Sequence, residues 1–238
     1  MKSLTKQDFI NDYFEVYINQ YVDIKSQQNI LLAYRLSKYA QFNRHRNKKY
    51  LKRPIKAVMS LVEIINTTNP TDIISLLLYY VIHNSYLLTF NDIKHIFANQ
   101  ESSKIIKLIK QLIEIEDIVN AKSALTKNKL QKYKKLFNKK LIKIKAAEVI
   151  GQLNTIDFSN ESSYFKKVHK KYLPIFDMYD NIGDIVALKL RKIVFQKLSY
   201  AKKQQKKGVI MIYNNVTDLF LIMNDIRFKN GNKTSNCN

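Results

Sequence analysis

Residues 75–84 read Ser75-Leu76-Leu77-Leu78-Tyr79-Tyr80-Val81-Ile82-His83-Asn84, and this segment gives the clearest indication of the fold. Leu76, Leu77 and Leu78 follow one another directly, and such an unbroken apolar run is typical of a helix surrounded by other parts of a protein rather than of a surface helix. The run is too short and too interrupted to cross a membrane, because a spanning helix needs about 20 apolar residues. We therefore predict a central buried helix and no membrane span.

Polar-tipped side chains end this apolar run. Tyr79 and His83 are four residues apart and share one helix face, and Tyr80 and Asn84 share the neighbouring face. Such side chains point into a pocket or against a partner helix. The alternative is two ordinary core tyrosines, because a buried tyrosine usually needs only one hydrogen-bond partner.

The composition of the chain favours an all-α fold. The 238 residues are 46% hydrophobic, which is enough for a full core, and only four glycines and three prolines are present. Tight turns are therefore few, and a β-rich fold is disfavoured. We expect one helical domain over residues 1–200, followed at 201–238 by a basic linker, a short apolar element and a disordered tail.

Helical spacing of apolar residues predicts a series of helices along the chain. Ser26 and Thr89 are candidate N-caps, Pro54 suits the first turn of a helix, and Gly151 marks a helix end or a close approach. A basic loop is expected at 43–54 and a polar linker at 202–207. The expected helices cover residues 8–20, 26–42, 54–65, 75–84, 89–97, 102–113, 129–150, 162–179, 184–200 and 209–228. Residues 209–213 could instead form a strand.

The formal net charge of the chain is +22. Such an excess attracts polyanions, so nucleic acid or nucleotides are possible partners. The alternative is compositional drift, because Lys, Asn, Ile, Tyr and Phe are all residues of AT-rich codons. Lysine is spread along most of the chain, with local excess at 44–53, 127–145 and 202–207, so both interpretations stay open.

Cysteine and histidine usage limits the chemistry. The single cysteine, Cys237, permits no disulfide framework and no cysteine-based zinc site. The N-terminus carries no apolar signal-peptide core, so we expect a reducing, cytoplasmic setting. The histidines are scattered singly, and a lone histidine is more often structural than a ligand.

The order of several short motifs resembles the HD domain of the (p)ppGpp hydrolases of the Rel/Spo type. The family's Leu-Leu-His-Asp-Val-Ile-Glu-Asp-Thr corresponds to Leu77-Leu78-Tyr79-Tyr80-Val81-Ile82-His83-Asn84-Ser85. Its Thr-x-x-Asp-Ile corresponds to Thr89-Phe90-Asn91-Asp92-Ile93, and its Ala-Asp-Arg-Leu-His-Asn to Ala147-Glu148-Val149-Ile150-Gly151-Gln152. Its Tyr-Ile-x-His-Pro corresponds to Tyr50-Leu51-Lys52-Arg53-Pro54. The resemblance covers about residues 30–198 and implies an HD-like helical bundle.

The resemblance implies a metal site that has lost most of its ligands. Family members hold a divalent metal, usually manganese, which activates a water for attack on the 3′-pyrophosphate. The matching metal-ligand positions here are Asn43 (or, with a small shift, His45), Tyr79, Tyr80 and Glu148. The matching acid–base positions are His83 and Asn84. Among the ligand positions only Glu148 keeps a carboxylate, and neutral tyrosine is a poor ligand for a hard divalent ion. Glu148 itself could be a leftover acidic residue.

Three functions follow as hypotheses. The first is a degenerate (p)ppGpp hydrolase domain without activity and without a metal, which could still bind guanosine polyphosphate or could equally be a decaying fragment with no function. The residues that would bind its phosphates are Arg44, Arg46, Lys48, Lys49 and Arg53. The second is an active manganese-dependent hydrolase whose rearranged site uses His45, His83 and Glu148. The third is a helical nucleic-acid-binding protein that uses the basic residues of 127–145 and 202–207. The sequence does not define an oligomeric state.

Overall fold

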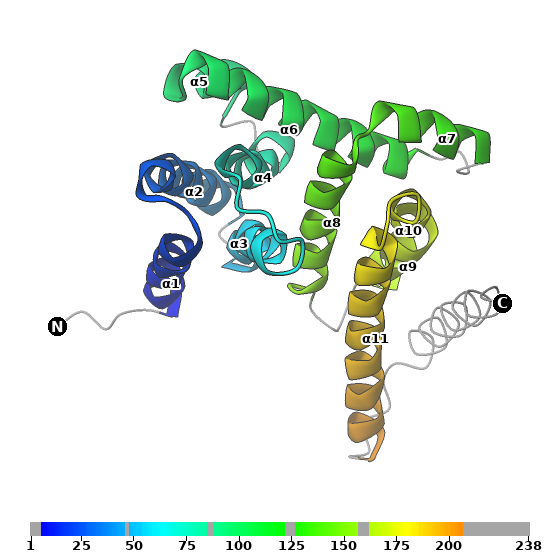
Figure 1. Cartoon of the computed structure of the whole chain (residues 1–238). Coiled ribbons are helices and arrows are strands. Elements are labelled where there is room, and N and C mark those ends of the chain that lie inside the picture. Colours follow the sequence, from blue (N-terminus) through cyan, green and yellow to red (C-terminus); the bar gives the residue numbers. More distant parts are fainter. Residues whose placement is uncertain (1–5, 46–47, 85–87, 122–126, 157–161, 207–238) are drawn as a thin grey trace. The chain divides into compact units, whose positions relative to one another are not determined.

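The computed structural model describes residues 6–45, 48–84, 88–121, 127–156 and 162–206 (Figure 1). Within these ranges the chain forms α-helices, one π-helical turn and no strand. The predicted all-α class is confirmed. In the same part of the chain, no helix is both long enough and apolar enough to span a bilayer.

The chain divides into two compact units. The first contains residues 1–122 and 139–155, and the second contains residues 123–138 and 156–238. The helices of the first unit are α1 (Lys6–Tyr21), α2 (Ile24–His45), α3 (Lys48–Glu63), α4 (Pro70–Asn84), α5 (Phe90–Ile96), α6 (Asn99–Asn120) and α8 (Lys139–Leu153). Those of the second are α7 (Lys127–Leu136), α9 (Ser162–Lys167), the π-helical turn η1 (Val168–Tyr172), α10 (Leu173–Phe176) and α11 (Ile182–Lys206).

Helix α4 is the centre of the first unit. Every residue from Ile73 to Val81 is buried, as the apolar run predicted. Helices α2, α3, α6 and α8 all pack against α4 (Figure 1). Because neighbours cover α4 on several sides, it buries apolar side chains all round. The polar ends of Tyr79 and Tyr80 are therefore held inside the protein rather than at its surface.

Helices α3 and α8 lie in close contact, and Gly151 explains how they do so. A Cβ atom at Gly151 would lie 2.5 Å from the backbone nitrogen and 2.5 Å from the Cα of Ala57. No side chain fits that gap, so only glycine allows the two backbones to approach in this way. The predicted close approach at Gly151 is confirmed, and it places α8 beside α3 along the stretch that carries Glu148.

One of the two predicted N-caps is confirmed. The Thr89 hydroxyl accepts a hydrogen bond from the Asp92 backbone N–H at 3.3 Å, and the Thr89 N–H donates to Asp92 at 2.7 Å, which forms a capping box on α5. The prediction for Ser26 was wrong. Helix α2 begins earlier, at Ile24, and the Asp23 carboxylate accepts from the Ser26 N–H at 3.0 Å. Asp23, the residue directly before α2, is therefore the N-cap of this helix.

The predicted basic loop at 43–54 is largely helical. Residues 43–45 are the end of α2, and α3 begins at Lys48. Pro54 consequently lies inside α3 rather than in its first turn. Lysine and arginine are good helix formers, so their concentration upstream of Pro54 favours an earlier helix start. Residues 46–47 lie outside the described part of the chain.

The predicted helix over 129–150 is two helices. Helix α7 ends at Leu136, α8 begins at Lys139, and the buried Phe137 lies at the break. Within the second unit, the Tyr179 hydroxyl donates to the carbonyl oxygen of Phe137. The Tyr179 hydroxyl thus replaces the hydrogen bond that a continuing helix would give to this carbonyl. The helix can therefore end here without leaving the carbonyl unpaired.

Helix α11 extends further than expected. It continues to Lys206 and includes most of the stretch predicted to be a linker. The predicted domain boundary near residue 200 therefore falls within a helix. The apolar element expected at 209–228 and the tail that follows lie outside the described residues.

Candidate functional site

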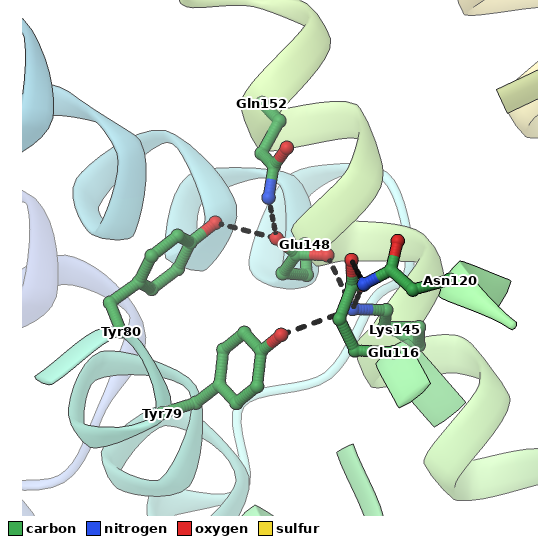
Figure 2. A network of polar contacts seen from close by, with 7 residues as sticks. All are labelled: Tyr79, Tyr80, Glu116, Asn120, Lys145, Glu148 and Gln152. Carbon is green, nitrogen blue, oxygen red and sulfur yellow. Dashed lines mark hydrogen bonds and ion pairs between the residues drawn. The ribbon is translucent and has the colours of Figure 1, made fainter. Parts of the chain in front are cut away.

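Three side chains matched to two separate parts of the family pattern meet in one buried cluster (Figure 2). Tyr79 and Tyr80 come from α4, and Glu148 comes from α8. The Tyr80 hydroxyl donates to Oε1 of Glu148 at 3.2 Å. Tyr79 and Tyr80 are 2% and 3% exposed, and Glu148 is fully buried. The sequence matches placed Tyr80 and Glu148 in one site although they are 68 residues apart, and the structure brings them into direct contact.

A lysine lies at the centre of this cluster. The side chain of Lys145 is fully buried, and its Nζ lies 3.0 Å from Oε2 of Glu148 and 2.8 Å from Oε2 of Glu116. The Nζ also donates to the Tyr79 hydroxyl oxygen at 3.3 Å and lies 5.1 Å from the centre of the Tyr79 ring. One ammonium group thus links oxygen atoms from α4, α6 and α8 (Figure 2).

The two carboxylates are also held by uncharged donors. The Gln152 side-chain amide donates to Oε1 of Glu148, and the Asn120 side-chain amide donates to Oε1 of Glu116 at 3.2 Å. Within the described ranges, Oε2 of Glu148 has no hydrogen-bond partner, so its contact with Lys145 is coulombic rather than a directed bond. Buried carboxylates need such partners because an isolated buried charge is very unfavourable.

Both tyrosines of the cluster stay protonated at neutral pH. Burial raises the pKa of the Tyr80 hydroxyl well above its ordinary value, and the negative charge of Glu148 raises it further. Burial also raises the pKa of Tyr79, although the nearby Lys145 opposes that shift. A hydroxyl that keeps its proton can donate a hydrogen bond to a carboxylate, as Tyr80 does, but it is a weak ligand for a divalent ion.

The remaining predicted site residues are only partly described. The His83 ring stacks on the Tyr79 ring with centroids 5.3 Å apart, and His83 is exposed. Arg53 is half-buried in α3. The predicted site residues whose side chains lie outside the described part of the structure are Asn43, Arg44, His45, Arg46, Lys48, Lys49 and Asn84. Their roles stay predictions.

The donor set does not fit the divalent metal that the resemblance implies. Both carboxylates already share the ammonium of Lys145, and the two nearest hydroxyls are neutral. Across the described side chains, no group of three or more His, Cys, Asp or Glu residues is arranged to hold a metal ion. Hard divalent ions require several anionic or imidazole ligands.

A separate hollow of about 390 Å³ lies where the first turns of α4 and α8 meet. The buried Asp72 pairs with Lys140 there at 2.8 Å, and burial raises the pKa of Asp72. The hollow is lined by Thr67, Asn69, Asp72, Lys139, Lys140, Lys143 and Ile144. Three lysines around one hollow favour an anionic group over a neutral one.

No family model, curated protein or solved structure matches this chain.

Sequence reasoning missed Lys145 and Glu116, although both carry a recognisable pattern. Lys145 follows Leu141 by four residues, so it occupies a core position of α8, and Glu148 lies three residues further on. Glu116 follows Leu112 by four residues in α6 and occupies a core position in the same way. Charged residues of opposite sign at core positions of two helices indicate a buried ion pair.

Proposed function

We propose that this chain is a non-hydrolytic relative of the (p)ppGpp hydrolases, with an HD-like helical scaffold that binds guanosine polyphosphate without cleaving it. The observation that carries this proposal is the contact between Tyr80 and Glu148 at 3.2 Å, with Lys145 beside them. The motif matches require these two positions to adjoin one site, so their proximity supports the alignment.

The loss of hydrolysis follows from the chemistry of the cluster. The family's reaction depends on a metal-bound water, whose acidity is raised by the divalent ion. Here the two carboxylates are paired with Lys145, and the two tyrosine hydroxyls remain protonated. Neither the carboxylates nor the hydroxyls are free to hold the ion that the reaction needs. We therefore propose that cleavage of the 3′-pyrophosphate has been lost.

The retention of nucleotide binding is supported by cationic side chains outside the cluster. The hollow lined by Lys139, Lys140 and Lys143 is large enough for a phosphate-bearing group. The predicted residues near the α2–α3 junction, including Arg53, are a second candidate region. Phosphate groups favour fixed cationic donors, and a guanosine carrying two diphosphates presents many such oxygens.

Calorimetric titration of ppGpp into the full chain tests binding, with GDP as the control ligand. We expect tighter binding of ppGpp than of GDP, and weaker ppGpp binding by the double variant K139Q/K143Q. The matched control is K104Q/K107Q, which removes two exposed lysines from α6. The binding proposal fails if ppGpp gives no heat. A parallel assay with Mn²⁺ should detect no release of pyrophosphate, and E148Q-sensitive release would show that the chain is an active hydrolase.

A further inference from the structure

We propose that the Lys145 ammonium is a built-in cation that occupies the position of a divalent ion between Glu116 and Glu148. This inference deepens the proposed function, since it names the group that has taken over the metal's charge. It rests on the contacts of the cluster itself, which involve only described residues of the first unit.

The geometry around the ammonium is that of a cation site. Its Nζ lies within 3.3 Å of three oxygens, one from each of Tyr79, Glu116 and Glu148. These oxygens belong to three different helices, and they converge on a single buried point (Figure 2). Lysine suits this place because its ammonium is a compact point charge at the end of a flexible stem.

The charges of the cluster explain why uncharged donors surround it. Lys145 carries one positive charge against the two negative charges of Glu116 and Glu148. Among these three groups, the ammonium offsets one of the two negative charges, whereas a divalent ion would offset both. Tyr80 and Gln152 donate to Glu148, and Asn120 donates to Glu116. These hydrogen bonds stabilise the remaining charge, as a buried ion group requires.

The same geometry predicts what happens when the ammonium is removed. Truncation of Lys145 to alanine leaves two carboxylates facing a cavity from which three methylene groups and the ammonium have gone. Carboxylate and hydroxyl oxygens are the ligands that Mg²⁺, Ca²⁺ and Mn²⁺ prefer. The wild-type chain should therefore be closed to divalent ions at this position, and K145A should be open to them.

Mn²⁺ titration of the full chain, followed by electron paramagnetic resonance of the free ion, tests the inference. The large positive charge of the protein keeps non-specific Mn²⁺ binding low. We expect K145A to bind Mn²⁺ at least about tenfold more tightly than the wild type, equal to about 1.4 kcal/mol. The double variant K145A/E148Q should lose that gain. The melting temperature of K145A should also rise with added Mn²⁺, because a ligand that binds only the folded state stabilises it.

Two results would overturn the inference. The first is a folded K145A that binds Mn²⁺ no better than the wild type does. The second is Mn²⁺ binding by the wild type that E148Q removes, since the ammonium would then not close the site. If K145A does not fold, K145Q replaces it in the same titration, because a glutamine amide can still donate to the carboxylates. No nucleotide takes part in this titration, so its outcome is independent of whether ppGpp binds.

Discussion

Replacement of Lys145 by methionine tests how strongly the buried cation holds the first unit together. Methionine keeps a long apolar stem and removes the charge. The ammonium lies 2.8 Å from Glu116 and 3.0 Å from Glu148. With an effective dielectric constant of about 20, each attraction is worth about 6 kcal/mol before the cost of desolvation is subtracted. Removal of one partner from a buried ion group costs a net of about 3–5 kcal/mol. We expect K145M to lose that much free energy of unfolding.

Urea unfolding followed by far-UV circular dichroism measures this loss. The matched control is K143M, which alters a half-buried lysine of the same helix and should stay within about 0.5 kcal/mol of the wild type. The triple variant K145M/E116Q/E148Q removes the buried charges together, so it should recover more than half of the loss. A K145M protein within about 1 kcal/mol of the wild type would refute the reasoning, and so would a triple variant as unstable as K145M.

Three further predictions follow from the described contacts. Because burial raises the pKa of Tyr80 above its unfolded value near 10, its contribution to stability is present below about pH 10 and is lost above it. Y80F should therefore lose stability less steeply than the wild type under alkaline urea unfolding, and parallel curves would contradict this. G151A should lower stability by about 1–3 kcal/mol despite alanine's better helix propensity, since its Cβ would overlap the Ala57 backbone; an unchanged melting temperature would show that the two helices can separate at no cost. T89A should cost about 1 kcal/mol through the loss of the α5 cap. The cap also lowers the pKa of Asp92, so its stabilising effect should fade as acid protonates that carboxyl; an equal difference between T89A and the wild type at neutral and acid pH would contradict this.

The parts of the fold that local pattern determines were predictable. The run from Leu76 to Val81 is apolar at nearly every position, so its burial on all sides followed from the sequence. Thr89 and Asp92 are three residues apart, which is the spacing of a capping box, so the cap of α5 could be recognised from the sequence. Gly151 stood out because glycine is rare in helices, and the structure supplies the reason in the nearby backbone of Ala57.

The parts that depend on distant contacts were not predictable. Helical periodicity continues through Phe137, so the break between α7 and α8 left no local trace. The carbonyl of Phe137 finds its partner in Tyr179, which is 42 residues away. The position of Pro54 within its helix was also not predictable, because a proline after a basic stretch is compatible with either a helix start or a helix interior.

The buried cluster was predictable only in part. The motif matches selected Tyr80 and Glu148, which are in contact. Lys145 was overlooked because lysine is abundant, and its burial depends on Glu116, 29 residues earlier in the chain. A lysine on an apolar helix face can be predicted to be buried only when the carboxylate that pairs with it is known.

The basic residues of the chain are not all at its surface. Lys145 lies inside the first unit, so it does not belong to a basic surface for nucleic acid. The exposed lysines Lys139 and Lys140 lie in the first turn of the same helix, α8, and are available to a polyanion. If nucleic acid is the partner, its binding should weaken by orders of magnitude between about 50 and about 200 mM salt.

The most direct test of the account is anomalous diffraction from a crystal of the wild-type chain grown with MnCl₂. We predict that the Lys145 ammonium lies within hydrogen-bonding or ion-pair distance of both Glu116 and Glu148, and that no manganese peak appears between them. A manganese peak bridging the two carboxylates, with the lysine displaced, would contradict the proposal that the internal ammonium occupies the position of a divalent ion.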